Sequence, residues 1–231
     1  MNNLTPLTPL VLDPAAKVAE GVERQIYVHP EDPTRLIKIM KARPTERYNR
    51  WTFSHLAKRY MPSTRYRPIA KQYDEFRRVM FTHHLDPDFI PPICHLYGFV
   101  PTTLGLGGVT ERVTDRAGNN APTLSDMAGA ISDAELAALN VFIARLYDLA
   151  ICASDLNPAN FVYGYRHIGA AGQRMGPEWV LVDGFGDRTA IPITALSAFI
   201  RRFALDDGFR RAKPVEGLRW DRARRAVLRR S

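Results

Sequence analysis

Three oxygen-bearing side chains in the last third of the chain are spaced as ligands of a charged substrate would be. Asp155 and Asn160 stand in the segment DLNPAN, and Asp183 follows the apolar segment WVLV. Pro158 ends any preceding helix, so we expect the first two residues in a loop. Carboxylate and amide oxygens are the ligands that Mg²⁺ prefers. The spacing therefore predicts a magnesium site.

The segments between these residues predict how they come together. Residues 161–165 and 179–182 have the composition of two strands joined by a Gly-containing connection, which is typical of a β-hairpin. An Asp, an Asn five residues later and a second Asp after a hairpin are the spacing of phosphoryl-transfer sites of the protein-kinase type. We therefore predict Asp155 as the general base, and Asn160 and Asp183 as the metal ligands. Loop turns stabilised by the Asp and Asn side chains are the alternative.

Two stretches of the sequence resemble a known family. IYVHPEDPTRLIKIM and DLNPANFVY…WVLVDGFGDRTAIPI are similar to the YrbL family of bacterial proteins of the PhoP regulatory network, related to the protein-kinase fold. The likeness spans roughly residues 18–212. It implies an α+β, two-lobed protein-kinase-like fold with an antiparallel-sheet N-lobe and a reduced, mainly helical C-lobe. It also implies that ATP and Mg²⁺ bind between the lobes.

The resemblance assigns four further residues to nucleotide binding. It implies that Lys38, in LIKIM, contacts the phosphates, that Gly21 lies in the turn over them, and that Glu111 ends the strand before the adenine-binding hinge. Glu75 is expected to hold Lys38 by an ion pair, with Asp74 as the alternative. A hairpin turn at Gly21, a Lys38 that points to water from an edge strand, and a solvated Glu75 remain open.

The sequence also departs from the protein-kinase pattern. Ala153 and Ser154 replace the His and Arg that precede the catalytic Asp, and Asn157 replaces a Lys. Only 48 residues follow Asp183, and no A-P-E motif occurs. We expect an atypical kinase-like protein, an ATP-dependent phosphotransferase whose hydroxyl acceptor is not a typical peptide. The alternative is a pseudokinase or regulatory nucleotide-binding module.

The predicted organisation has three parts. An N-terminal arm (1–16) precedes an N-lobe (17–113) with a strand meander over 17–40, a basic insertion (41–68) and a helix over 69–85. The C-lobe (114–231) contains a long helix after the capping-box pair Ser132 and Glu135, a catalytic loop (153–160) and a metal loop (183–187). Two basic helices are predicted over 194–231. The insertion suits either single-stranded nucleic acid or a capping helix.

Charge is concentrated at the end of the chain. Of the net charge of +8, residues 199–231 contribute +7, from 11 Lys or Arg against 4 Asp or Glu. Such clusters attract nucleic-acid phosphates, anionic lipid or an acidic partner. A solvated helix is the alternative.

Length and composition exclude several other classes. The 231 residues are 45% hydrophobic, enough to bury a core. We expect no transmembrane segment because no run of about 18 apolar residues occurs. The N-terminal segment has no basic flank and is broken by prolines, which argues against a signal peptide. Cys94 and Cys152 lack metal-ligand spacing, so we expect reduced thiols, no zinc site and a cytoplasmic location.

Overall fold

The chain forms two compact units. The computed structural model describes residues 8–21, 24–41, 66–153, 155–168, 175–186 and 197–230. One unit comprises Met1–Ile69 and Leu96–Arg112, and the other comprises Ala70–His95 and Val113–Ser231. The step from Arg112 to Val113 lies one residue before the predicted boundary, whereas residues 70–95, predicted in the N-lobe, group with the second unit. Residues 1–7 of the predicted arm, most of the basic insertion (41–68), Ser154, Asp187 and residues 194–196 lie outside the described residues.

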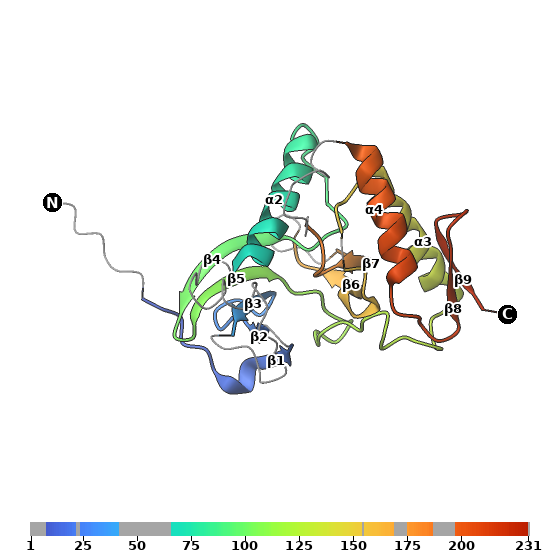
Figure 1. Ribbon diagram of the computed structural model, residues 1–231. Coiled ribbons are helices and arrows are strands. Elements are labelled where there is room, and N and C mark those ends of the chain that lie inside the picture. The colour runs from blue at the N-terminus through green and yellow to red at the C-terminus, as the bar shows by residue number, and fades with distance from the viewer. Residues whose placement is uncertain are drawn as a thin grey trace, which may run out of the picture. The chain divides into compact units, whose positions relative to one another are not determined.

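A five-stranded antiparallel sheet forms the first unit, with the strand order β1-β2-β3-β5-β4 (Figure 1). Its strands are β1 (Lys17–Glu20), β2 (Arg24–Val28), β3 (Arg35–Met40), β4 (Leu96–Thr102) and β5 (Gly105–Glu111). The predicted meander over residues 17–40 is confirmed as the first three of them. Because β5 pairs with both β3 and β4, β3 is a central strand of the sheet.

One face of β3 supplies the core of this unit. Ile37 and Ile39 are buried and pack with Leu12 and Tyr27. A side chain at Gly107 of β5 would meet the Cγ2 atom of Ile37 at 2.5 Å, so the isoleucines can pack here only because that residue is Gly. Alternation along the strand places the residue between the two isoleucines on the opposite face.

That residue is Lys38. It is 5% exposed and lies opposite Ile26 of β2 and Gly108 of β5. The alternative in which Lys38 points to water from an edge strand is therefore wrong, because β3 has a neighbour on each side and the side chain is buried. A buried ammonium group is costly without compensating interactions, so its place in the strand is a specific feature of the sequence.

Residues of the N-terminal arm dock on the free edge of the sheet. The Leu10 N–H donates to the Pro101 carbonyl at 2.9 Å, and the Thr103 N–H donates to the Leu10 carbonyl at 3.0 Å. Leu12 is buried just before the short 3₁₀ turn η1 (Pro14–Ala16). The arm thus covers the edge of β4, where unpaired backbone groups would otherwise attract another strand.

In the described part of the chain, three helices belong wholly or mostly to the second unit: α2 (Arg67–Thr82), α3 (Asp133–Asp148) and α4 (Ala198–Arg211). The capping box at the start of α3 is confirmed, since the Ser132 hydroxyl accepts from the Glu135 N–H and the Glu135 carboxylate accepts from the Ser132 N–H. None of the helices within the described ranges is long and apolar enough to cross a membrane. Together with the antiparallel sheet of the first unit, these helices give the chain the predicted mixed α+β fold.

The prediction of a second helix in the C-terminal tail is wrong. After α4, the chain forms an antiparallel hairpin of β8 (Leu218–Asp221) and β9 (Ala226–Arg229). Gly217, in the turn directly before β8, has φ +73°, a backbone conformation that is absent from α-helices. Trp220 stacks on Phe209 of α4 at 4.3 Å, and Val227 exchanges backbone hydrogen bonds with the Asn140 side chain of α3. These tertiary contacts stabilise the β-hairpin, and their contribution outweighs the intrinsic helix propensity of the tail sequence.

Candidate functional site

A β-hairpin in the second unit positions two of the predicted ligands. It consists of β6 (Phe161–Arg166) and β7 (Met175–Leu181), preceded by the 3₁₀ turn η4 (Pro158–Asn160). Phe161 pairs with Leu181, and the Val182 N–H donates to the Asn160 carbonyl at 2.9 Å. Asn160 thus lies at the start of the hairpin and Asp183 just after its end. The predicted hairpin is confirmed, with a longer second strand than expected.

The loop before the hairpin pairs with the loop after it. Ala153 forms a β-bridge with Phe185, and the Gly186 N–H donates to the Cys152 carbonyl at 2.7 Å. The Asp155 N–H donates to the Gly184 carbonyl at 3.2 Å. These backbone bonds fix the two loops side by side, so the catalytic loop and the metal loop of the sequence-based prediction are neighbours within one unit.

Side-chain bonds then orient the metal-binding candidates. The Asn160 amide donates through Nδ2 to the Asp155 carbonyl at 3.0 Å, which leaves its Oδ1 atom as the one able to ligate a cation. The Oδ1 atom of Asp183 accepts from the Gly184 N–H at 2.7 Å. Both side chains are half-buried. Hard oxygen atoms held in this way suit Mg²⁺, which needs only one or two protein oxygens when phosphates and water complete its shell.

Gly184 and Gly186 allow this close approach of the loops. Gly184 has φ +80°, and a Cβ atom there would clash with the Asp155 carbonyl and lie 2.9 Å from the Nδ2 atom of Asn160. Gly186 has φ +97°, and a Cβ atom there would lie 2.6 Å from the Lys71 carbonyl of α2. Both positions require a residue without a side chain.

Helix α2 contributes a side chain that the sequence-based prediction missed. The Gln72 amide donates through Nε2 to the Oδ1 atom of Asp183 at 2.5 Å, and Gln72 is buried. The helical spacing over residues 69–85 predicted an apolar face of Ile69, Tyr73, Phe76, Met80 and Leu85. Ile69 is buried, but Leu85 is exposed, and the polar residues Gln72 and Glu75 are buried. The sequence signal for this side chain is the spacing of Gln72 and Glu75, because polar residues three positions apart lie on the same face of a helix.

Glu75 is the centre of a buried ionic cluster. Its carboxylate accepts two bonds from Arg78, at 2.6 and 3.1 Å, and lies 3.6 Å from the Arg201 guanidinium of α4. It also accepts from the Cys152 N–H at 2.8 Å. Arg78 donates in turn to the Leu149 and Ala150 carbonyls at the end of α3. The cluster thereby braces the start of the loop that carries Asp155.

The remaining predicted residues lie in the first unit. Lys38 occupies the buried face of β3 described above, and Glu111 is buried at the end of β5. Gly21 is exposed in the turn after β1, where its N–H donates to the Arg24 carbonyl at 2.8 Å. Their roles in nucleotide binding stay predictions, as does the ion pair of Lys38 with Glu75 or Asp74.

Within the described residues, no three His, Cys, Asp or Glu side chains cluster as a metal site. Asn160 and Asp183 instead offer two oxygen ligands, a number that fits a metal ion delivered with a phosphate ligand.

The fold and the loops define an α+β protein with an antiparallel sheet in one unit and a hairpin-linked pair of Asp-bearing loops in the other. The chain belongs to the YrbL family: the family model described as PhoP regulatory network protein YrbL matches residues 10–213. The resemblance predicted from the sequence is thus confirmed. No curated protein matches the chain in sequence.

Several solved structures are similar to the chain. They include the kinase domain of PF14_0431, with 12% identity, a TM-score of 0.42 and coverage of 72% of this chain and 48% of that one. Rad53 in complex with AMP-PNP has 18% identity, a TM-score of 0.38 and coverage of 73% and 36%. The Mycobacterium tuberculosis PknI kinase domain has 15% identity, a TM-score of 0.38 and coverage of 83% and 70%. The chain thus spans about half or less of the first two.

Proposed function

We propose that this protein binds Mg·ATP and transfers its terminal phosphoryl group to a hydroxyl acceptor. The observation that carries the proposal is the pairing of the two loops, which brings Asp155, Asn160 and Asp183 together through the Asn160–Asp155 and Asp155–Gly184 bonds. This constellation resembles the metal and base positions of protein-kinase-type sites.

Asn160 and Asp183 would hold the magnesium ion through their side-chain oxygens. When bound, the ion neutralises charge on the phosphates. Gln72 and the Gly184 N–H orient the Asp183 carboxylate, so this metal-binding group would have its position before the nucleotide binds. Lys38 would supply a second positive charge to the phosphates, a role that rests on its place in a buried strand.

Asp155 would accept the proton of the acceptor hydroxyl. The acceptor oxygen forms a bond to the terminal phosphorus, the bond from that phosphorus to the bridging oxygen breaks, and ADP leaves with the electron pair. Such transfer depends mainly on positioning and charge neutralisation. The backbone bond from the Asp155 N–H to Gly184 supports the positioning role.

Turnover of ATP in the presence of Mg²⁺ tests the proposal. We expect Asp155→Asn to lose turnover while retaining nucleotide binding, and Asp183→Asn to lose both. Asp148→Asn, an exposed change at the end of α3, should retain both. Equal turnover in the wild type and Asp155→Asn would contradict the role of Asp155 as the base.

A regulatory nucleotide-binding module is the second candidate. This candidate is favoured by Ala153, which is buried two residues before Asp155. Its methyl group cannot form a hydrogen bond to an acceptor or a phosphate. In that case the wild type binds Mg·ATP in a manner that depends on Asp183 but shows no turnover above that of Asp155→Asn.

A further inference from the structure

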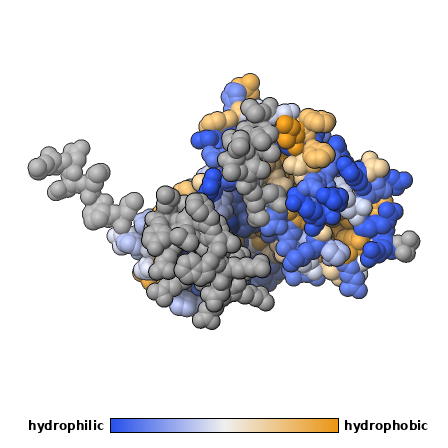
Figure 2. All heavy atoms as spheres, in the orientation of Figure 1, coloured by the Kyte–Doolittle hydropathy of each residue, from blue (hydrophilic) through white to orange (hydrophobic). Residues whose placement is uncertain are grey.

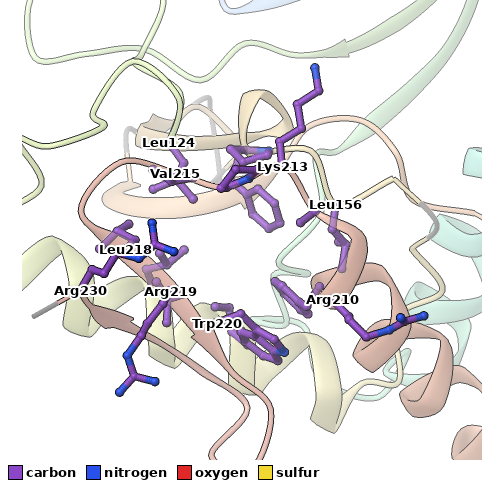
Figure 3. A pocket seen from close by; sticks show the side chains of 17 residues that line it. Leu124, Leu156, Arg210, Lys213, Val215, Leu218, Arg219, Trp220 and Arg230 are labelled. Atoms are coloured by element: carbon purple, nitrogen blue, oxygen red, sulfur yellow. The ribbon is translucent and has the colours of Figure 1, made fainter.

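A cavity lies within the second unit, behind the loop that carries Asp155. Its volume is about 350 Å³, within the range of small-molecule sites. Leu156 and Pro158 of that loop line it, together with residues of α3, the end of α4 and the β8–β9 hairpin (Figure 3). Neither Lys38 nor the three polar site residues line this cavity, so it is separate from the candidate site.

The walls of the cavity are largely apolar and partly aromatic. Phe161 and Phe209 have their ring centroids 6.2 Å apart, and Trp220 stacks on Phe209 at 4.3 Å. All three rings line the cavity. The Trp220 Nε1–H group is buried and has no hydrogen-bond acceptor within the described ranges. An unpaired buried donor is costly, so this wall can accommodate a polar acceptor as well as an apolar body.

Positive charge surrounds this apolar space. Arg210, Lys213, Arg219 and Arg230 contribute to the lining. Arg210 is neutralised by Asp207 at 2.5 Å. In the part of the chain that the structure describes, the side chains of Lys213, Arg219 and Arg230 have no acidic partner. Figure 3 shows the charged ends of Lys213 and Arg219 extending outward at opposite edges, so the charge lies at the rim.

The surface around the cavity has the same character. Figure 2 shows hydrophilic residues on the visible face over the β8–β9 hairpin, with apolar residues between them. Other arginines of the tail are occupied by acidic partners, such as Arg225 with Asp206 and Arg229 with Asp133. Three of the tail cations without an acidic partner among the described residues, Lys213, Arg219 and Arg230, therefore line the cavity.

We propose that this cavity binds a small organic anion. The apolar body of the ligand contacts Phe161, Phe209 and Trp220, and its carboxylate, sulfonate or phosphate head lies at the rim with Lys213 and Arg219. Apolar walls remove the body from water, and the rim charge selects the anion over a neutral molecule of the same shape. This ligand is distinct from the nucleotide of the proposed function.

The position of the cavity allows a bound ligand to affect the loop that carries Asp155. Leu156 is buried, and its Cδ1 atom would lie 3.0 Å from a Cβ atom at Gly208, so the loop packs tightly on α4. A ligand that contacts Leu156 and Pro158 restricts the segment between Asp155 and Asn160. An effect on turnover rests on the proposed function, whereas binding itself does not.

Two anionic probes, 2-naphthoate and decanoate, test the proposal by calorimetric titration of the full chain. At least one should bind saturably, and about tenfold more tightly than its neutral counterpart, 2-naphthamide or decanamide. Lys213→Gln/Arg219→Gln should weaken that binding by about tenfold, since two rim charges are lost. Val215→Trp, which places a large ring in the lining, should abolish it.

The matched control is Arg116→Gln/Arg224→Gln. It removes the same charge from two exposed residues that do not line the cavity, so affinity should stay within about twofold of the wild type. The proposal is overturned if neither anion binds saturably, if the neutral compounds bind equally well, or if both double variants weaken binding to the same degree.

Discussion

The Glu75 carboxylate shows how much one buried side chain organises near the candidate site. It accepts from Arg78 and from the Cys152 N–H and lies close to Arg201, so it connects α2, α4 and the start of the loop that carries Asp155. A carboxylate with so many donors is anchored by geometry as well as by charge. Its removal takes away the negative charge that these groups share.

Glu75→Gln should therefore destabilise the protein by about 3 kcal/mol, because it removes one charge of a largely buried ionic cluster. Urea denaturation measures the loss. The control is Asp74→Asn on the same helix, whose exposed ion pair with Arg77 should be worth less than about 1 kcal/mol. If the two variants lose the same stability, the Glu75 cluster does not brace the loop.

Gln72 should affect metal binding more than stability. Gln72→Met keeps the size of the side chain but removes the donor to Asp183. Loss of such an orienting bond weakens metal affinity by roughly 10- to 100-fold. The measurement is the Mg²⁺ concentration needed for half-maximal ATP binding. An unchanged Mg²⁺ requirement in a folded variant would exclude an orienting role for Gln72.

Tyr147 should make stability depend on alkaline pH. Burial, and then the hydrogen bond of its hydroxyl to Asp206 at 2.6 Å, raise the pKa of Tyr147 well above the ordinary value of 10.0. Below pH 10 both folded and unfolded chains keep the proton. Above it the unfolded chain loses the proton first, so the free energy of unfolding falls by up to about 1.4 kcal/mol per pH unit.

Tyr147→Phe removes this contribution, so its unfolding free energy should decline less steeply than that of the wild type above pH 10. Urea titrations at a series of pH values from 9 to about 11 give the two curves. Parallel curves would show that Tyr147 does not hold its proton more tightly in the folded state.

The sequence placed Asp155, Asn160 and Asp183 in two loops joined by a hairpin, and the structure pairs those loops. Gln72 and Arg201 could not be found in the same way. Their partners lie 111 and 126 residues away along the chain, as the Gln72–Asp183 and Arg201–Glu75 contacts show. A periodicity analysis counts apolar positions, so it treats a buried polar residue as solvent-facing.

At the scale of elements, the pairing of the two loops depends on Gly184. Gly184→Ala introduces a strained positive φ and a clash with the Asp155 carbonyl, so we expect a loss of stability of about 3 kcal/mol. Gly118→Ala is the matched control, since φ is +89° there but no atom lies within 4 Å of the added Cβ. It should lose only about 1 kcal/mol.

Chemical denaturation gives the free energy of unfolding of both variants, which separates the cost of the positive φ from the cost of the clash with the Asp155 carbonyl. The difference between them reports the cost of forcing the loops apart. Equal losses for the two variants would mean that the close approach at Gly184 contributes nothing to stability.

Local signals predicted the elements that depend on local bonds. The capping box marked the start of α3, and turn residues marked the β1–β2–β3 meander. The C-terminal hairpin was missed because its stability comes from the stacking of Trp220 on Phe209 and from the bonds of Val227 to Asn140. Its basic side chains are compatible with either a helix or a hairpin.

At the scale of the whole molecule, the composition predicted the positive charge of the tail but not which basic side chains form ion pairs. Residues 199–231 carry a net charge of +7, yet five of their arginines form ion pairs. Two of these pairs reach acidic residues outside the segment, Arg201 with Glu75 of α2 and Arg229 with Asp133 of α3. The tail is therefore partly a structural clamp on the second unit. Lys213, Arg219 and Arg230, which have no acidic partner among the described residues, are the charges that we propose attract an anion at the cavity rim.

The sequence analysis divided the chain once, just after Val113, and kept the helix over residues 69–85 in the first part. Most of this helix groups with the second unit, because Gln72, Glu75 and Arg78 all bond to loops of that unit. A linear division of the sequence cannot represent a segment that leaves one unit, joins the other and returns.

Thermal unfolding with and without Mg·ATP tests the proposed nucleotide site most directly. At 100 times its dissociation constant the ligand should raise the unfolding free energy of the wild type by about 2.7 kcal/mol. Asp148→Asn should show the same increase, and Asp183→Asn should show none. An equal increase in Asp183→Asn, or no increase in the wild type at any Mg·ATP concentration, would contradict a magnesium-nucleotide site at these loops.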